Sequence, residues 1–157
     1  MDKRKEALGI VGFCVEFSKN LVTVTEPGAI LIFDRVISNV KRCYDTSTGI
    51  FTAPCNGQFA LYISGVAITN DENGYVDLTI ERKKNNSRPF GPIARVYLKA
   101  YFGDFMLGCQ GCGSARVKLE RGEQIIVRHT RGDHVLKGGR HTRFSGVLEH
   151  VYDDPQP

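Results

Sequence analysis

Apolar and polar residues alternate along several stretches of the chain with the period of two that is typical of half-buried β-strands. The clearest of these stretches are residues 11–17, 76–81 and 94–102. In the first of them Val11, Phe13, Val15 and Phe17 share one face, which we expect to face the core. Residues 59–68 are apolar on both faces, a pattern that predicts a central strand covered on two sides.

Turn-forming residues separate these stretches, and no segment sustains the period of a helix. The main turn signals lie at residues 26–28, 45–49, 70–74 and 121–122. The alternating residues on either side of Arg121-Gly122, at 115–119 and 125–127, are expected to pair as a tight hairpin. A last strand is expected over residues 142–152. Roughly eight to ten short strands at even spacing predict an all-β protein, which could be a sandwich, a jelly roll or a barrel.

The length of 157 residues suits a single domain, which we place at residues 10–153 with short tails at 1–9 and 154–157. No apolar run approaches the roughly 18 residues of a membrane span, so none is expected. The first residues imitate a secretion signal, but no small-residue cleavage site follows them. We therefore expect mature protein, from which a signal peptide was either removed or never present.

Five residues at fixed separations form a pattern of an aromatic, an Asn, two further aromatics and a Gly: Phe33, Asn39, Tyr44, Phe51 and Gly57. This pattern resembles the signature of C1q globular-head domains. Three local strings are also similar to strings of that family: FDRV at 33–36, YDTSTGIFTAP at 44–54 and FSGVL at 144–148. The resemblance runs in order over residues 11–152, which is nearly the whole chain.

The resemblance implies a ten-stranded jelly roll and a compact homotrimer, with paired trimers as the larger assembly. The chain departs from the family at Leu61 and Ile63, which replace aromatic residues, and buried apolar swaps of this size leave a fold intact. No collagen-like Gly-X-Y stretch precedes the domain, so assembly on a collagen stalk is not expected. The resemblance therefore points to a stalkless member, a type that often serves invertebrate innate immunity.

Positive charge gathers at residues 82–88 and 128–143, within a net charge of +4. We expect the second segment to be one loop between the last two strands, and Gly138-Gly139 to let that loop adapt around a ligand. Its cationic and imidazole groups can donate hydrogen bonds to hydroxyls, carboxylates or phosphates. The candidate ligand-binding residues are Arg131, Asp133, His134, Lys137, Arg140 and His141. A solvated loop without a ligand is the alternative interpretation.

The other motifs of this segment give weaker evidence of function than these candidate ligand-binding residues do. Arg131-Gly132-Asp133 matches the integrin-type adhesion tripeptide, which we interpret as a chance match. His129 is expected to pack rather than to bind a metal, because the three histidines of the segment follow no standard zinc spacing. The net charge is modest and no aromatic residues interleave with the basic ones, so a nucleic-acid partner is not expected.

Five cysteines make an odd number, so at least one thiol is free or pairs between chains. Cys109 and Cys112 form a single CxxC, which could be half a zinc site or a redox pair. We favour a structural role, as a disulfide or as spare thiols on a glycine-rich loop. Cys14 is expected to be a small buried residue of a strand.

No motif requires a cofactor, and the sequence leaves only the binding of calcium open. Acidic residues on turns could supply oxygen ligands for calcium, although no loop of EF-hand type is present: Asp71, Glu72 and Asp104. Asn85-Asn86-Ser87 is an N-glycosylation sequon in an expected loop. No catalytic motif is found, so the protein is not expected to be an enzyme.

The preferred hypothesis is a secreted, extracellular, lectin-like pattern-recognition protein of innate immunity. It would bind microbial surface glycans, such as lipopolysaccharide or mannose-type polysaccharides, through loops presented in several copies by an oligomer. The alternative is a secreted signalling ligand, like the tumour necrosis factor (TNF) or adipokine branch of the superfamily, with a cell-surface receptor as its partner.

Overall fold

The computed structural model describes residues 11–23, 27–68, 75–85, 88–99, 109–132 and 135–152. These residues form twelve strands, several of only two or three residues, and one 3-10 helix, η1, at Val40–Arg42. The strands are β1 Gly12–Glu16, β2 Leu21–Thr23, β3 Arg35–Asn39, β4 Tyr44–Asp45, β5 Ile50–Thr52, β6 Gly57–Ile68, β7 Tyr75–Lys83, β8 Gly91–Lys99, β9 Cys109–Leu119, β10 Gln124–Arg131, β11 Val135–Lys137 and β12 Arg143–Val151.

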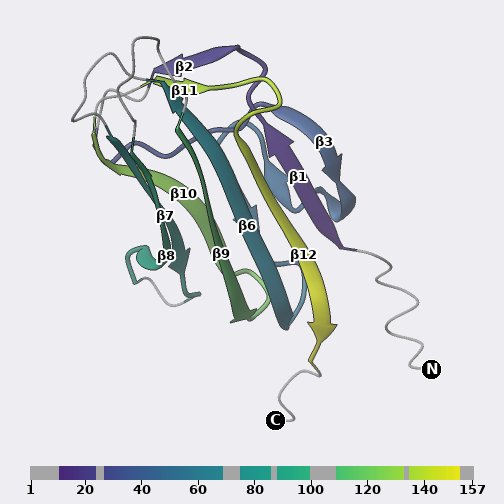
Figure 1. Cartoon of the computed structure of the whole chain (residues 1–157). Helices are drawn as coiled ribbons and strands as arrows, with labels where there is room; N and C mark the ends of the chain where they lie inside the picture. The colour runs from purple at the N-terminus through teal and green to yellow at the C-terminus, as the bar shows by residue number, and fades with distance from the viewer. Residues whose placement is uncertain are drawn as a thin grey trace.

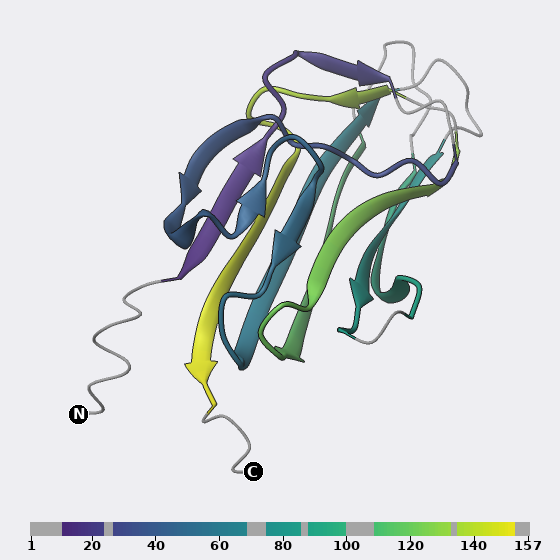
Figure 2. The same ribbon diagram turned by 180° about the vertical axis from the view of Figure 1, so that it is seen from behind.

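The strands form two antiparallel sheets that face each other as a sandwich (Figure 1). The seven-stranded sheet has the order β2-β11-β6-β12-β1-β3, and β9 pairs along the opposite edge of β6. The five-stranded sheet has the order β4-β5-β10-β7-β8. Seen from behind, β10, β7 and β8 lie away from β1 and β12 (Figure 2). The prediction of an all-β sandwich is confirmed.

The predicted central strand is β6, which has neighbours along both edges. Its inner face is buried, and Leu61 and Ile63 fill the core there beside Phe59. Its outer face is open, because the side chain of Tyr62 is 46% exposed. The expectation that this strand is covered on both faces is therefore wrong for the single chain.

The hairpin expected around Arg121-Gly122 is also wrong. A turn is present, with Gly122 at a φ of +88°, but β9 pairs with β6 while β10 pairs with β5 and β7. The turn is tied to the β5–β6 connection, since Arg121 N donates to Asn56 Oδ1 at 2.8 Å and Gly122 N donates to Ala53 O at 2.9 Å. It therefore carries the chain from one sheet to the other.

Aromatic rings fill the space between the sheets. The ring centroid of Phe13 in β1 lies 5.3 Å from that of Tyr44, 4.9 Å from Phe51 and 5.0 Å from Phe144. Phe33 extends this group at 5.9 Å from Phe144. All five rings are buried, and burial of this aromatic area dominates the energetics of a core. The cluster joins strands of both sheets.

Residues of the sequence signature hold this cluster in place. Asn39 Oδ1 accepts a hydrogen bond from Tyr44 N at 3.1 Å, and Asn39 Nδ2 donates to Tyr44 O at 2.7 Å. Phe33 N donates to the Tyr44 hydroxyl at 3.1 Å, and burial raises the pKa of Tyr44 to about 12. Gly57 is required because a Cβ at this position would lie 2.6 Å from the carbonyl oxygen of His150.

Replacing Phe144 by Ala should lower the free energy of unfolding by about 3–5 kcal/mol, because a cavity opens among the surrounding rings. Equilibrium unfolding in urea measures this loss. The control Glu149→Ala, on the same strand, removes a surface ion pair with Arg116 and should cost under about 1 kcal/mol. Equal losses in the two variants would contradict the central place given to the aromatic cluster.

Candidate functional site

The candidate residues of the basic segment do not all lie together. Arg131 ends β10 in the five-stranded sheet, whereas Lys137 ends β11 in the seven-stranded sheet. Arg140 and His141 lie in the turn that follows β11. Two further candidates lie outside the described residues: Asp133 and His134. The structure thus brings together Lys137, Arg140 and His141, and separates them from Arg131.

The expectation of a single loop from residue 128 to residue 143 is wrong. Both β11 and β12 pair with the same edge of β6, at Ala67 and at Ser64 respectively. Residues 138–142 therefore form a turn that leaves the sheet between these two pairings. Backbone pairing divides the basic segment, and the charge pattern of the sequence does not show where.

The two arginines at the ends of the segment take part in structural ion pairs. Arg128 Nε lies 2.8 Å from Glu81 Oε2, and its Nη1 donates to Gly28 O at 2.6 Å. Arg143 Nε donates to Glu16 Oε2 at 2.9 Å. These two side chains are therefore committed to the fold, in contrast to Lys137, Arg140 and His141.

The last three residues border a hollow of about 330 Å³, here called the cationic recess. Its other lining residues are Asn20, Arg35, Gly138 and Gly139. They come from three parts of the chain: the bend before β2, strand β3, and the end of β11 with its turn. Figure 1 shows β2 and β11 side by side at one end of the sandwich. The volume is at the lower end of small-ligand pockets, roughly 300–1,000 Å³.

The turn that carries the recess is held closely against the bend before β2. Gly138 N donates to Asn20 O at 2.7 Å, and Gly139 N donates to Lys19 O at 3.1 Å. A Cβ on Gly138 would lie 1.8 Å from Lys19 O, and Gly139 has a φ of +61° that favours glycine. Gly138 therefore serves close packing and Gly139 a positive φ, which explains both glycines without the adaptable loop that we expected.

Both walls of the recess are anchored by side chains. Ser18 N donates to Asp34 Oδ1 at 2.9 Å and Ser18 Oγ donates to Oδ2, which holds the pKa of Asp34 below its usual value. Thr142 Oγ1 donates to Lys137 O at 2.7 Å and accepts from Val66 N at 3.3 Å. The recess is thus formed by backbone that is fixed before any ligand arrives.

A buried carboxylate organises the charges beside the recess. Glu16 of β1 is 1% exposed, and its Oε1 accepts from Arg35 Nε at 2.7 Å and from Arg35 Nη2, while Oε2 binds Arg143. Burial by itself would raise the pKa of Glu16, but hydrogen bonds from both arginines and their charges outweigh it and hold the pKa below its usual value. One buried negative charge therefore positions two guanidinium groups.

The recess presents hydrogen-bond donors and positive charge. Arg35, Lys137 and Arg140 are cationic, His141 adds an imidazole, and no carboxylate occurs among the described lining residues. Guanidinium and ammonium groups bind carboxylates and phosphates through charge-assisted hydrogen bonds, and they also donate to hydroxyls. Arg35 is the member that sequence reasoning missed, because it is far away in the chain and arrives through the pairing of β1 with β3.

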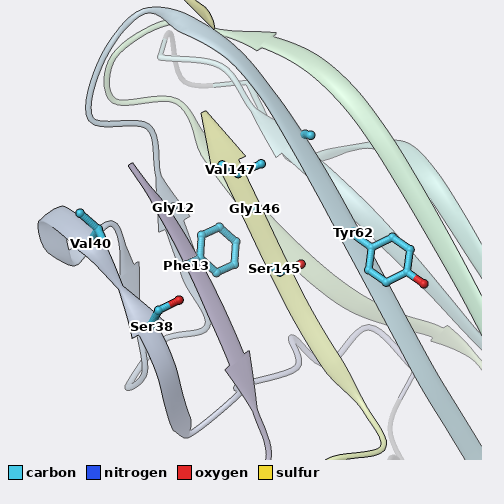
Figure 3. A pocket seen from close by; sticks show the side chains of 9 residues that line it. Gly12, Phe13, Ser38, Val40, Tyr62, Ser145, Gly146 and Val147 are labelled. Atoms are coloured by element: carbon cyan, nitrogen blue, oxygen red, sulfur yellow. The ribbon is translucent and has the colours of Figure 1, made fainter. Parts of the chain in front are cut away.

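A second hollow of about 320 Å³, here called the apolar groove, lies on the outer face of the seven-stranded sheet. It is lined by Gly12, Phe13, Ser38, Val40, Ala60, Tyr62, Ser145, Gly146 and Val147. Figure 3 shows Phe13 between β1 and β12, with Tyr62 to one side and Val40 to the other. A Cβ on Gly146 would lie 2.6 Å from Phe13 Cε1, so glycine leaves room for the buried Phe13 ring beneath the groove. The only sequence signal was the two-sided apolar pattern of residues 59–68.

Four cysteines of the described part are free thiols: Cys14, Cys43, Cys55 and Cys112. Cys14 is only half-buried, which corrects the expectation of full burial, and desolvation raises its pKa. Cys109 and Cys112 lie in strand β9 and not on a loop. Three residues of strand separate their Cα atoms by about 10 Å, which is too far for a disulfide between them.

Within the described residues, the remaining candidates give no metal site. His129 is fully buried in β10, which confirms the prediction that it packs. No group of three His, Cys, Asp or Glu side chains that could hold a metal occurs in the described ranges. The acidic residues considered for calcium lie outside them: Asp71, Glu72 and Asp104. Asn85 of the sequon is exposed, and its Nδ2 donates to Arg121 O at 2.9 Å.

Replacing Gly138 by Ala should lower the free energy of unfolding by about 1–3 kcal/mol, because the added methyl group must displace the backbone of Lys19. Thermal and urea unfolding measure this loss. Gly91→Ala is the matched control, since a Cβ at Gly91 meets no atom within 4 Å. A Gly138→Ala protein as stable as the control would contradict the close packing of the turn.

Glu16 should make stability depend on pH in acid. A carboxylate whose pKa is lower in the folded state stabilises that state above its unfolded pKa, and the contribution disappears as the pH falls through the folded pKa. Glu16→Gln should therefore cost about 1–3 kcal/mol at pH 7. The difference from wild type should shrink as the pH is lowered below 4.5. Urea unfolding from pH 7 to pH 3 checks this, and a constant difference would contradict it.

Solved structures of low sequence identity share this fold. Eiger TNF from S. frugiperda has a TM-score of 0.75 at 15% identity, over 94% of this chain and 98% of that one. The globular domain of zebrafish complement 1qA protein has a TM-score of 0.68 at 14% identity, over 90% and 99%. Murine APRIL has a TM-score of 0.66 at 11% identity, over 89% and 99%. The architecture is therefore C1q/TNF-like.

Within the described residues, no helix is long and apolar enough to cross a membrane. The C1q domain model matches residues 12–148 of this chain. Domains of that family are non-enzymatic, their proteins are usually secreted, and C1q/TNF members typically form trimers. The match covers most of the chain and agrees with the sandwich architecture, so the protein belongs to the C1q domain family.

Proposed function

We propose that this protein is a secreted, lectin-like pattern-recognition protein that binds anionic microbial glycans in the cationic recess. The observation that carries the proposal is the recess itself, where Arg35, Lys137, Arg140 and His141 surround one rigid hollow. The carboxylate of Glu16, which binds Arg35 at the wall of the recess, is buried and already neutralised by two arginines. The remaining positive charge at the surface of the recess is therefore available to bind a ligand.

Lipopolysaccharide suits this site because its inner sugars carry phosphate and carboxylate groups beside hydroxyls. A phosphate or carboxylate would accept hydrogen bonds from Arg140 and Lys137, and sugar hydroxyls would pair with His141 and Asn20. Because the backbone of the turn is fixed, little conformational entropy is lost on binding. Mannose-type polysaccharides lack the charge and should bind less tightly at this site.

The proposed assembly is a homotrimer that associates through the apolar groove. The groove exposes apolar surface of Val147 and the half-exposed Tyr62 on an otherwise small-residue sheet face. Val36, Ile37 and Val40 are also exposed close to it, and apolar patches of this kind mark protein interfaces. Three copies of a weak sugar site would raise the avidity for a repetitive surface by roughly 10² to 10⁴.

The double variant Lys137→Ala/Arg140→Ala should bind lipopolysaccharide at least about tenfold more weakly than wild type, while its melting temperature changes little. Surface plasmon resonance on immobilised lipopolysaccharide at 0.15 M salt measures the affinity, and binding should weaken further as salt rises. The matched control Lys84→Ala/Arg88→Ala removes the same charge from the β7–β8 end. Equal losses in both variants would indicate non-specific attraction, and no loss in either would place the site elsewhere.

Sedimentation should give a mass of three chains for the wild type at micromolar concentration. Tyr62→Lys/Val147→Lys should give one chain, because two charges cannot be buried unpaired in an interface. Tyr97→Lys is the control, since Tyr97 is equally exposed on the other sheet. A monomeric wild type, or a trimer that survives the double variant, would overturn the proposed assembly.

A further inference from the structure

The outer face of the five-stranded sheet carries two tyrosines and two arginines around one buried carboxylate. Asp77 of β7 pairs in register with Tyr97 of β8 on one side and with Arg131 of β10 on the other. Tyr75 is two residues before Asp77 and shares its face, as does Arg95, two residues before Tyr97. We call these five residues the outer platform.

The arginine of the outer platform is fixed in place but open to solvent. Arg95 Nε donates to Asp77 Oδ1 at 2.7 Å, and Arg95 Nη2 donates to Asp77 Oδ2. The side chain of Asp77 is 4% exposed, whereas that of Arg95 is 61% exposed. Both carboxylate oxygens are thus occupied, while Nη1 of Arg95 has no partner among the described residues. A guanidinium fixed in this way has two N–H groups available to a ligand, and its side chain loses little conformational entropy when the ligand binds.

Tyr97 provides a flat apolar surface beside this guanidinium. Its side chain is 50% exposed, and its ring lies 5.4 Å from the ring of Tyr75, centroid to centroid, at an interplanar angle of 30°. The guanidinium carbon of Arg95 lies 5.7 Å from the Tyr97 centroid. Contacts on two sides hold the ring, so an exposed aromatic face and a cation have a fixed relative position.

The charge of the outer platform selects the ligand. Among the described residues of this platform, Arg95 and Arg131 carry two positive charges against the single carboxylate of Asp77, so one positive charge is unmatched. A protein partner would require apolar surroundings, but the neighbours that are partly exposed on this face are polar, namely Thr79, Arg128 and Thr130, and Ile126 beside Glu81 is buried. A sugar ring stacked on Tyr97 with a carboxylate at Arg95 Nη1 and Arg131 satisfies both the aromatic surface and the charge.

We infer that the outer platform is a second glycan site, which binds a carboxylate-bearing sugar such as a uronic acid. Its ligand class rests on the proposed function, but its residues do not overlap with the cationic recess. It also lies on the sheet opposite to the apolar groove, so the assembly proposed above leaves it exposed (Figure 2). The inferred site gives Arg131 a role in ligand binding, although the fold separates this residue from Lys137, Arg140 and His141.

The test is fluorescence-polarisation binding of labelled tetragalacturonate, with labelled tetragalactose as the uncharged probe of equal size. The wild type should prefer the acidic probe at least about tenfold. Tyr97→Ala should weaken its binding at least about tenfold, while Tyr97→Phe, which keeps the ring, should bind like wild type. Arg131→Gln should weaken binding of the acidic probe and leave binding of the neutral probe unchanged. This variant also tests the site independently if Tyr97→Ala does not fold.

The recess variant Lys137→Ala/Arg140→Ala separates this inference from the proposed function. It should retain tetragalacturonate binding while it loses lipopolysaccharide. If this variant no longer bound tetragalacturonate while Tyr97→Ala and Arg131→Gln bound it fully, the second site would be overturned and the recess would remain as the binding site. A wild type that binds lipopolysaccharide but neither tetramer would also overturn the second site alone. A wild type that binds none of the three would overturn both proposals.

Discussion

The structure depends on the aromatic cluster between its two sheets. Phe13, Tyr44, Phe51 and Phe144 come from four strands, and the ring centroid of Phe13 lies 5.3, 4.9 and 5.0 Å from those of the other three. A sandwich has few local contacts, so burial of these rings decides which face of each strand turns inward. Once those faces are fixed, the polar residues between them must point outward. The recess, the groove and the outer platform all lie on surfaces that this constraint defines.

Arginine bound to a buried carboxylate recurs on these outward surfaces. Glu16 binds Arg35 and Arg143, Asp77 binds Arg95, and comparable ion pairs join Glu81 to Arg128 and Glu123 to Arg82. Each acid is buried while its arginine is partly exposed. The favourable interaction fixes a guanidinium in a chosen direction, and long flexible side chains otherwise lose much entropy when they bind. The proposed recognition of acidic glycans depends on these fixed guanidinium groups.

Much of the fold followed from the sequence, because alternation reports directly on burial. It predicted β1, β6, β7 and β12, and the signature from Phe33 to Gly57 reflects the packing and hydrogen bonding around Tyr44. Alternation does not report which strands pair, so the turn at Arg121-Gly122 was misread as a hairpin. Charge clustering placed Lys137, Arg140 and His141 together but could not exclude Arg131 or include Arg35, since their positions depend on long-range pairing. The groove was missed because an uncovered apolar face looks the same as a buried one in sequence.

The central claim is that the turn from Gly138 to Thr142 and its neighbours bind the ligand as a preformed site. Nuclear magnetic resonance of the ¹⁵N-labelled protein, titrated with the phosphorylated core oligosaccharide of lipopolysaccharide, tests it most directly. The account predicts that the largest amide shifts occur at Gly138, Gly139, Arg140, His141 and Asn20, with amides of the β7–β8 end unchanged. Saturable shifts confined to other surfaces, with these five amides unmoved, would contradict it.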